Sequence, residues 1–399
     1  MTDDFLIVGA GIVGLTIARE LISRFPLARI VIIEKEHEIG FHASGRNSGV
    51  LHSGIYYPPM SLKAKVCANG GKLMMDYARQ EKIKFEQKGK LILATHPDDL
   101  GVVDKLLLNA KKNEIPAERV DTKTAIEIEP HVNKDNHGGI FCSSTAVING
   151  MEVLQSIYQE LKEAGVKFYF GTRLLAKSNE FEVVTNNGKF RFSFLVNSAG
   201  AYADQIAQMF GLSKNFELLP FKGIYWRLAS ASNYKVRSNI YPVPDMNLPF
   251  LGVHLTRNIH NEIYIGPTAI PSLGRENYKI FSGLRPGEAL SIFKRLSLMY
   301  LSNRNNMRKV THQEIAKYSK LNFLKDIQNL VPSIKSSELC KSLKVGIRPQ
   351  LVNKDTNELE MDYVLEAGKN SIHILNAISP AFTGSFEFAK IIVSNIERS

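Results

Sequence analysis

The chain is poor in cysteine, in tryptophan and in long apolar runs. Its 399 residues include three cysteines, Cys67, Cys142 and Cys340, and one tryptophan. The cysteines lie far apart and match neither a disulfide framework nor the spacing of a zinc site, so we expect a reducing compartment and no metal. No segment approaches the roughly 20 apolar residues that a membrane-spanning helix needs. The first apolar stretch follows Asp3 and Asp4, where a signal peptide carries positive charge, and the expected location is therefore cytoplasmic.

Acidic residues are also few, with 39 against 50 basic ones and a pI near 9.3. Such a balance suits nucleic acid, an anionic membrane surface or anionic small molecules. The basic residues are scattered, with short clusters at 63–65 and 304–309 and no basic tail. We therefore expect no nucleic-acid binding and a small anionic substrate. The excess of basic residues is also compatible with peripheral contact with the inner face of the cell membrane.

The residues that are present begin with a strand, a glycine-rich turn and a helix. The apolar run 5–8 is typical of a buried parallel strand, and Gly9, Gly11 and Gly14 follow where the strand becomes a helix. In this pattern the glycines allow a tight turn, the approach of a pyrophosphate and close packing of the helix on the strand. The helix N-terminus then stabilises the phosphates with free N–H groups and its dipole.

An acidic residue completes this pattern. A second apolar strand, 30–33, ends at Glu34, which lies 20 residues after Gly14. A carboxylate at this distance binds ribose hydroxyls and repels a 2′-phosphate. The combination predicts a Rossmann-like dinucleotide-binding domain, with Lys35 next to the ribose carboxylate. The alternative is a glycine-rich turn in an unrelated sheet protein.

A long polar loop follows at 41–59. Loops of this length in compact domains are usually functional, and the alternative is a solvent-exposed connection. Its serines, asparagine and glycines suit a large polar cofactor, and an arginine can bind phosphate or carbonyl oxygens. The cofactor contacts expected here are Ser44, Arg46, Asn47, Ser48 and Gly49.

Four segments carry a specific resemblance. Residues 42–59, 61–65, 241–245 and 249–256 are similar to the L-2-hydroxyglutarate oxidase or dehydrogenase family, within the larger D-amino-acid-oxidase-like group of FAD enzymes. The similarity runs over nearly the whole chain. It implies FAD as cofactor and the oxidation of L-2-hydroxyglutarate to 2-oxoglutarate, with hydride transfer to flavin N5. The resemblance departs from the family pattern at Asn149-Gly150 and at Gly274.

Two later turns are expected to reach the cofactor. The apolar strand that starts at residue 195 ends in Ala199 and Gly200, and the resemblance implies that these pack against FAD. Near the C-terminus a turn opens a helix and directs several N–H groups at one point, where they can stabilise charge that develops on the flavin. The alternative is an ordinary helix N-cap. The expected contacts in this turn are Pro380, Thr383, Gly384 and Ser385.

Oxidation of an alcohol needs a base for the hydroxyl proton, and histidine suits this role at neutral pH. Of the 10 histidines, His52 in the polar loop and His254 are the candidates, with a slight preference for His52. Either could instead bind a substrate carboxylate. Two substrate carboxylates need fixed donors, with arginine best suited to bidentate binding. Arg348 is the first choice among the expected substrate-binding residues, which are Tyr56, Lys222, Tyr241, Arg257, Arg275 and Arg348.

The length predicts two domains, and 44% apolar with 22% charged residues is typical of a globular protein. The predicted fold class is α/β: a Rossmann-like FAD-binding domain and a second substrate domain on a mostly antiparallel sheet (α+β). Short strands are expected at 223–228, 239–242, 250–256 and 262–265. We assign 1–85, 145–215 and 340–399 to a discontinuous FAD-binding domain. Residues 86–144 and 216–339 then form the substrate-binding domain.

Two other functions stay open at this point. One is a related FAD oxidase or dehydrogenase acting on an amino acid, another 2-hydroxy acid or glycerol 3-phosphate. The other is a flavin-containing binding or RNA-associated protein. The electron acceptor, oxygen or quinone, is also open, as are the oligomeric state and the mode of flavin attachment.

Overall fold

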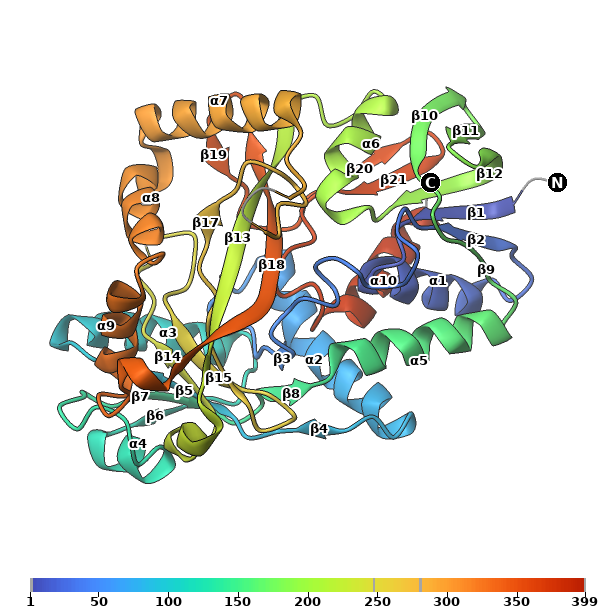
Figure 1. Ribbon diagram of the computed structural model, residues 1–399. Coiled ribbons are helices and arrows are strands. Elements are labelled where there is room, and N and C mark those ends of the chain that lie inside the picture. Colours follow the sequence, from blue (N-terminus) through green and yellow to red (C-terminus); the bar gives the residue numbers. More distant parts are fainter. Residues whose placement is uncertain (1–2, 247, 280–281, 398–399) are drawn as a thin grey trace.

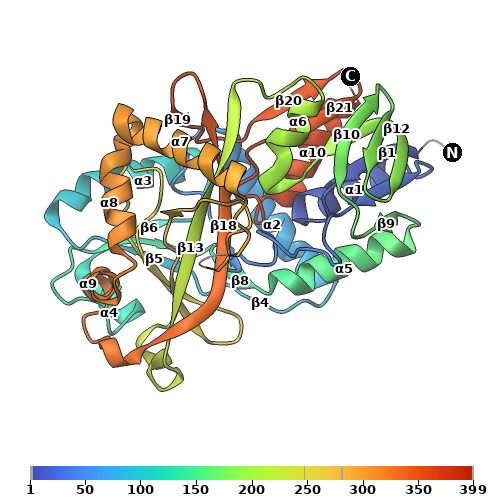
Figure 2. The ribbon, with the colours of Figure 1, turned by 45° about the horizontal axis from the view of Figure 1, so that its top comes forward.

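Two large sheets make up the fold, one at each side of the molecule (Figure 1). The computed structural model describes residues 3–246, 248–279 and 282–397. Both views place the two ends of the chain beside the eight-stranded sheet (Figure 2). Three helices pack against a face of the ten-stranded sheet: α7 (Pro286–Ser302), α8 (Met307–Ala316) and α9 (Lys320–Leu330). Within the described residues, no helix combines the length and apolar character that a bilayer crossing requires.

The eight-stranded sheet has a parallel core in the order β9-β2-β1-β12-β21. Its strands are β9 (Lys167–Tyr169), β2 (Ile30–Ile33), β1 (Asp3–Val8), β12 (Gly188–Asn197) and β21 (Ser371–Ile374). Antiparallel strands extend it: β10 (Leu174–Asn179), β11 (Glu182–Thr185) and β20 (Leu365–Gly368). Parallel sheets are covered on both faces, and accordingly every residue of β2 and β21 is buried.

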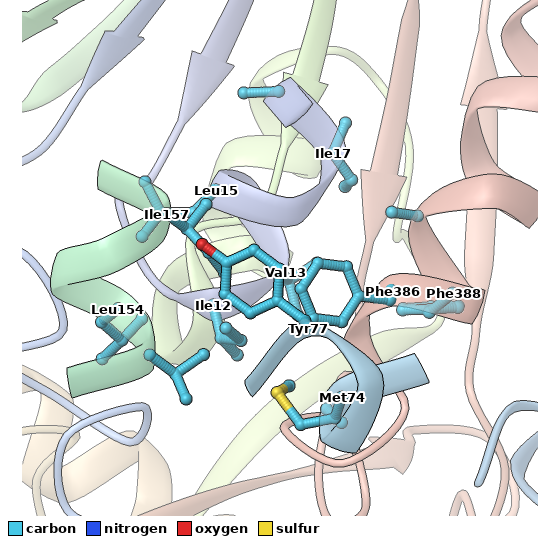
Figure 3. Close-up of a cluster of buried hydrophobic side chains, with 14 of the residues drawn as sticks. Ile12, Val13, Leu15, Ile17, Met74, Tyr77, Leu154, Ile157, Phe386 and Phe388 are labelled. Carbon is cyan, nitrogen blue, oxygen red and sulfur yellow. The ribbon is translucent and has the colours of Figure 1, made fainter. Parts of the chain in front are cut away.

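Helices cover one face of this sheet. They are α1 (Ile12–Arg24), α5 (Gly150–Glu163) and α10 (Ser385–Ile396), with α2 (Leu62–Gln80) packed beside α10. In Figure 3, Ile12, Leu154 and Ile157 meet around the ring of Tyr77, whose centroid is 5.0 Å from that of Phe386. On the opposite face, Ile206 of α6 (Ala203–Met209) packs with Leu6 and Val31, and the side chains of β10 and β11 join the same apolar cluster. Burial of both faces fixes the carboxyl ends of β1 and β2, where the glycines and Glu34 lie.

The ten-stranded sheet has the order β19-β18-β13-β16-β15-β14-β5-β7-β6, with β17 paired to β13. Neighbouring strands are antiparallel except β14 and β5. The strands are β19 (Glu358–Leu359), β18 (Leu339–Asn353), β13 (Phe216–Leu228), β16 (Ile263–Gly266), β15 (His254–Arg257), β14 (Asn239–Pro242), β5 (Lys90–Leu93), β7 (Gly139–Cys142), β6 (Glu118–Val120) and β17 (Ile270–Pro271). Helices α3 (Leu100–Lys112) and α4 (Thr122–Ile128) belong to this side. A small sheet of β3 (Val50–Leu51), β8 (Ala146–Ile148) and β4 (Phe85–Glu86) completes the fold.

The predicted fold class, α/β with a second mostly antiparallel sheet, is confirmed. Residues 340–359, which the sequence analysis places in the FAD-binding domain, belong to the ten-stranded sheet in the structure. Strand β18 pairs with β13 from Phe216 opposite Asn353 to Leu228 opposite Leu339, so this segment extends the ten-stranded sheet. The chain returns to the eight-stranded sheet at β20. The division into two functional domains stays a prediction.

Candidate active site

A cavity of about 440 Å³ lies where the two sheets meet. Its walls include Gly9 and Glu34 from the eight-stranded side and His254 and Arg348 from the ten-stranded side. His52, which follows β3 of the small sheet, also lines it. Residues far apart in the sequence therefore line one cavity.

The turn after β1 has the geometry that a phosphate group needs. Gly9 has a φ of +107°, and a Cβ there would lie 2.7 Å from the carbonyl oxygen of Ser198. A Cβ on Gly14 would lie 2.1 Å from the carbonyl oxygen of Gly9, so the helix packs directly on the turn. The first N–H groups of α1 have no partner within the helix, and Ser44 Oγ accepts that of Ile12 at 3.0 Å. This cradle fits the diphosphate of a dinucleotide.

Backbone hydrogen bonds hold the Glu34 carboxylate at the end of β2. Its Oε2 accepts the N–H of Ala10 at 2.8 Å, and its Oε1 accepts the N–H of Glu36 at 2.9 Å. Both oxygens have room for further donors, because a carboxylate has about four acceptor positions. The arrangement suits the ribose hydroxyls next to the diphosphate cradle.

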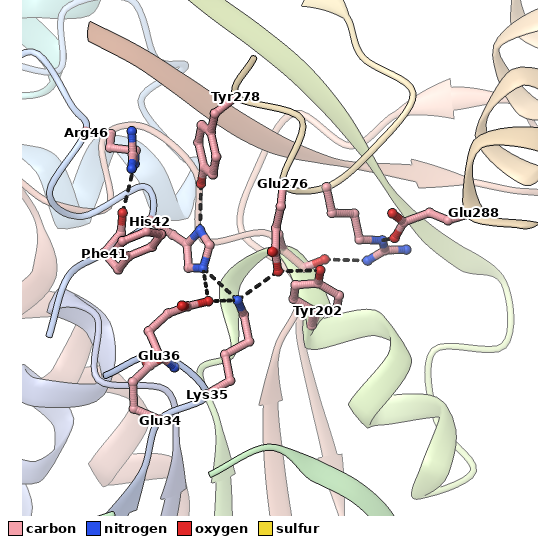
Figure 4. A network of polar contacts seen from close by, with 12 residues as sticks. Glu34, Lys35, Glu36, Phe41, His42, Arg46, Tyr202, Glu276, Tyr278 and Glu288 are labelled. Atoms are coloured by element: carbon pink, nitrogen blue, oxygen red, sulfur yellow. Dashed lines mark hydrogen bonds and ion pairs between the residues drawn. The ribbon is translucent and has the colours of Figure 1, made fainter. Parts of the chain in front are cut away.

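Beside Glu34, a network of ionic contacts connects the two sides of the molecule (Figure 4). The ammonium of Lys35 contacts Glu36, the Nε2 of His42 at 2.7 Å and Glu276 at 2.8 Å. The Nδ1 of His42 lies 2.6 Å from the hydroxyl of Tyr278. Glu36, His42 and Glu276 could together hold a metal ion. The Lys35 ammonium already supplies the cation at this point.

The contacts within this network determine which of its side chains are charged. Burial opposes ionisation of Glu276, but hydrogen bonds from Lys35 and Tyr202 lower its pKa to about 2. Burial, then the charge of Lys35, lowers the pKa of His42. The guanidinium of Arg46 lies 4.2 Å from the ring centroid of Tyr278. These contacts close the Glu34 end of the cavity with residues from both sheets.

The two candidate bases lie against the cavity. Burial, then the charges of Lys90 and His254, lowers the pKa of His52 to about 3. Burial also lowers the pKa of His254 to about 4. The Nδ1 of His254 lies 2.9 Å from the carbonyl oxygen of Gly252, which can only accept, so Nδ1 carries the proton and Nε2 has a free lone pair. Both histidines are therefore neutral at physiological pH.

Arg348 brings a positive charge to the same cavity, and no carboxylate of the described residues forms an ion pair with it. Its Nε is buried without a hydrogen-bond partner among the described residues, and its guanidinium lies 5.1 Å from the ring centroid of Phe250. Burial lowers the pKa of Arg348, although an arginine stays charged at neutral pH. A half-buried cation of this kind is stabilised by an anionic ligand.

The other expected cations have partners already. Arg275 lines the cavity, but it forms a bidentate ion pair with Asp204 at 2.5 and 2.8 Å. Lys222 donates to Asn277 at 2.7 Å. Arg257 donates to the carbonyl oxygen of Val236 at 2.7 Å. We therefore do not carry these three residues into the proposed substrate site.

The cavity brings together most of the residues selected from sequence. Those that line it are Gly9, Gly11, Glu34, Lys35, Ser44, Arg46, Asn47, Ser48, His52, Ala199, Gly200, His254, Arg275, Arg348, Pro380 and Thr383. The remaining ones do not line it: Gly14, Gly49, Tyr56, Lys222, Tyr241, Arg257, Gly384 and Ser385. Gly384 has a packing role, because a Cβ there would lie 2.3 Å from Val66 on α2. Thr383 binds the strand before His52, since its Oγ1 accepts the N–H of His52 at 3.2 Å.

Sequence reasoning missed several residues of the cavity wall. Tyr202, Tyr225, Phe250 and Tyr278 line it, as does His42. Aromatic residues in strands and turns give the same pattern whether they face a core or a ligand. His42 lay inside the polar loop, and its position there was the available signal.

The two departures from the family pattern have local structural reasons. Asn149 caps α5, with its Oδ1 accepting the N–H of Met151 at 3.1 Å. A Cβ on Gly150 would lie 3.2 Å from the ring of Phe382, and one on Gly274 would lie 2.6 Å from the carbonyl oxygen of Gly283. Both glycines therefore permit close contacts near the cavity.

Comparison with known proteins agrees with this geometry. The family model described as FAD dependent oxidoreductase (DAO) matches residues 4–394. The chain is 34% identical to the mitochondrial L-2-hydroxyglutarate dehydrogenase of Homo sapiens, covering 99% of this chain and 89% of that protein. It is 31% identical to the L-2-hydroxyglutarate dehydrogenase of Escherichia coli, covering 99% and 93%.

Solved structures share the fold. The L-alpha-glycerophosphate oxidase of Mycoplasma pneumoniae, solved with FAD bound, has a TM-score of 0.79 at 21% identity, over 100% of this chain and 95% of that one. Glycine oxidase of Geobacillus kaustophilus has a TM-score of 0.74 at 18% identity, over 100% and 95%. With its glycine cradle and ribose carboxylate, the chain belongs to the FAD-dependent oxidoreductases of the DAO family and groups there with the L-2-hydroxyglutarate dehydrogenases.

Proposed function

We propose that this FAD enzyme oxidises L-2-hydroxyglutarate to 2-oxoglutarate. The observation that carries the proposal is the set of groups in one cavity: two neutral histidines and Arg348, which forms no ion pair with the described residues, beside the cofactor cradle. Relatives that are 31–34% identical over almost the whole chain are named for this activity. A small dicarboxylate matches the excess of positive charge.

Each residue has a distinct role in the proposed reaction. FAD, when bound, would supply N5 as the acceptor for the hydride of the carbon that carries the hydroxyl. His52 accepts the hydroxyl proton, with His254 as the second candidate. Arg348 binds a substrate carboxylate through its guanidinium. The carbon loses a hydride and the oxygen loses a proton, which together give the ketone.

The low pKa values of the histidines are consistent with this role in the free enzyme. A general base must start neutral, and burial keeps both rings neutral. A substrate with two carboxylates brings negative charge into the cavity, which raises the pKa of a nearby histidine. The base therefore becomes stronger when the substrate is bound.

The test is flavin reduction in the absence of oxygen. L-2-hydroxyglutarate should bleach the flavin band near ~450 nm, whereas its D enantiomer, L-malate, glycerol 3-phosphate and amino acids should not. Reduction by one of the latter would transfer the assignment to that substrate. No reduction by any of them would favour a binding protein.

The base is tested by substitution. His52→Ala should retain flavin and slow its reduction about 100-fold or more, because a general base contributes that much. His254→Ala is the matched variant, since both rings are buried against the same cavity. Unchanged reduction by His52→Ala, with slow reduction by His254→Ala, would transfer the role to His254.

We also propose an electron acceptor at a membrane surface. Helices α7 to α9 and the turn before α9 carry exposed apolar side chains among lysines and arginines, including Leu290, Phe293, Leu301, Tyr318 and Leu321. Apolar and basic residues together favour anionic lipid surfaces. Cosedimentation with phosphatidylglycerol vesicles, and faster reoxidation of the reduced enzyme by a short-chain quinone than by oxygen, would support this. Fast reoxidation by oxygen without vesicle binding would make the protein an oxidase.

A further inference from the structure

A second pocket, of about 290 Å³, lies beside the main cavity. Its wall comes from three parts of the chain: the segment after β2, the first turn of α5, and β18. Gly40, Phe41 and Arg46 line both the pocket and the main cavity, so the two spaces share one wall. A ligand in the second pocket would therefore lie beside the cofactor site without entering the space around His52 and Arg348, which line the main cavity alone.

Four apolar side chains line the second pocket: Ile39, Phe41, Met151 and Val345. The ring of Phe41 is 39% exposed, although burial of an aromatic ring is favourable. Its free face suits stacking with another flat ring. An apolar cavity of about 150 Å³ accommodates benzene, so this pocket has room for one substituted six-membered ring.

Lys344 adds an unused hydrogen-bond donor to the pocket wall. Among the described residues its Nζ has neither a hydrogen bond nor an ion pair, and it lies 4.8 Å and 5.5 Å from the ring centroids of Tyr264 and Tyr225. Glu262 acts on it electrostatically, but that carboxylate already accepts hydrogen bonds from Arg227 at 3.1 Å and Tyr264 at 3.2 Å. A lysine side chain has N–H groups in both protonation states, so Lys344 can donate whatever its charge.

Arg46 provides further donors at the shared wall. Its Nε donates to the carbonyl oxygen of Phe41 at 2.8 Å, and its guanidinium lies beside the Phe41 ring, 5.2 Å from the centroid (Figure 4). A guanidinium has five N–H donors, and this hydrogen bond uses one. Glu38 also lines the pocket, but it is exposed and forms an ion pair with neither Arg46 nor Lys344. Apolar walls with a few placed donors are typical of a site for a small, flat ligand with carbonyl oxygens.

We propose that the second pocket binds the electron acceptor, a quinone whose ring packs on Phe41 and whose carbonyl oxygens accept hydrogen bonds from Lys344 and Arg46. The inference deepens the proposed function, on which it rests for the use of a quinone. The quinone takes up the two electrons and two protons that oxidation of the alcohol releases, and it leaves as the quinol. Substrate and acceptor then occupy different sites, and each can bind while the other is present.

Binding of ubiquinone-1, a short-chain quinone, to the oxidised holoenzyme tests the site without turnover. Isothermal titration calorimetry gives the Kd for wild type, Lys344→Met and Val345→Phe. Lys344→Met removes the donor and keeps the length of the side chain, so the Kd should rise about tenfold or more. Val345→Phe narrows the pocket and should also raise the Kd. Equal Kd values in wild type and both variants, or no binding to wild type, would overturn the proposal.

Lys341→Met is the matched control. Lys341 is an exposed lysine on the same strand, and it lines neither the second pocket nor the main cavity. Its replacement should leave the Kd of ubiquinone-1 as in wild type. Lys344→Arg keeps a donor at the pocket and should bind ubiquinone-1 better than Lys344→Met. Flavin absorbance checks that each variant retains its cofactor.

Competition with glutarate distinguishes two sites from one and needs no variant. Glutarate has both carboxylates of the proposed substrate and no hydroxyl, so it should bind at Arg348 without being oxidised. Saturating glutarate should leave the Kd of ubiquinone-1 unchanged. An apparent Kd that rises in proportion to the glutarate concentration would show that both ligands use the main cavity, and it would overturn the proposal.

Reoxidation separates this inference from the proposed function. Flavin that is reduced by light in the presence of EDTA needs no substrate, and ubiquinone-1 should reoxidise it about tenfold more slowly in Lys344→Met than in wild type. Failure of L-2-hydroxyglutarate to reduce the flavin, with this difference present, would reject the substrate and retain the acceptor site. Reduction by L-2-hydroxyglutarate, with equal reoxidation of Lys344→Met and wild type, would retain the substrate and reject the site.

Discussion

Replacement of Arg275 by methionine should destabilise the protein and leave substrate binding nearly unchanged. The Arg275 side chain is 6% exposed and that of Asp204 is 1% exposed, and two hydrogen bonds of 2.5 and 2.8 Å join them. Arg275 also donates to the carbonyl oxygen of Ala201. The substitution leaves the Asp204 carboxylate buried without its counterion. Breaking such a pair costs about 3–5 kcal/mol in the free energy of unfolding.

A second substitution tests whether this cost comes from the unpaired charge. Asp204 also accepts the N–H of Leu218 at 2.9 Å, and an asparagine can still accept this hydrogen bond. Asp204→Asn in the Arg275→Met background should therefore recover part of the lost stability, because the buried charge is removed. Urea unfolding followed by circular dichroism measures the stability lost in Arg275→Met and the part recovered in the double variant. Steady-state kinetics measures KM.

An exposed ion pair provides the control. Arg119 pairs with Asp104 on the surface, and Arg119→Met should leave the unfolding midpoint within experimental error. If Arg275→Met has wild-type stability and a strongly raised KM, the reasoning is refuted. Arg275 would then bind the substrate, as the sequence suggested.

Two further predictions concern the cofactor cradle and its ionic network. Gly14→Ala should weaken FAD binding about tenfold or more, because its Cβ would lie 2.1 Å from the carbonyl oxygen of Gly9; the flavin to protein absorbance ratio measures this. Gly101→Ala, where nothing lies within 4 Å of the new Cβ, should bind FAD normally. Glu276→Gln should lower stability most above pH 4.5, because the pKa of Glu276 falls from 4.5 to about 2 on folding. The difference from wild type should close as the pH falls toward 2 in acid unfolding, and a constant difference would contradict the assigned ion pair with Lys35.

Local patterns in the sequence predicted the cofactor side of the molecule well. The strand, glycine turn, helix and second strand ending at Glu34 appear as β1, α1 and β2 with bounds within a few residues of those expected. The hydrogen bonds and steric demands of this unit are short-range, so the residues that satisfy them lie close together in the chain. A helix after the C-terminal turn was also expected, and α10 begins there, at Ser385.

Long-range pairing was harder to predict. Strand β18 contains Lys341, Lys344, Gly346 and Pro349, which break the alternation typical of a strand, and its partner β13 lies more than 100 residues earlier. Only pairing with β13 makes this segment a strand. Contacts between distant residues also determine the site, and local sequence patterns do not reveal them.

The charge partners of the site were not predictable from spacing. Arg275 and Arg348 both looked suitable for binding a carboxylate. In the structure Asp204 forms an ion pair with Arg275, whereas the Nε of Arg348 has no partner among the described residues. That contact depends on how α6 lies against the loop that follows β17.

The walls of the cofactor cavity come from both sheets, and this has a thermodynamic consequence. A ligand that contacts two structural units adds its binding free energy to the cohesion between them. Flavin supply in the cell would then determine how long newly made chains survive proteolysis, independently of any catalysis. The amount of this enzyme would accordingly follow riboflavin status.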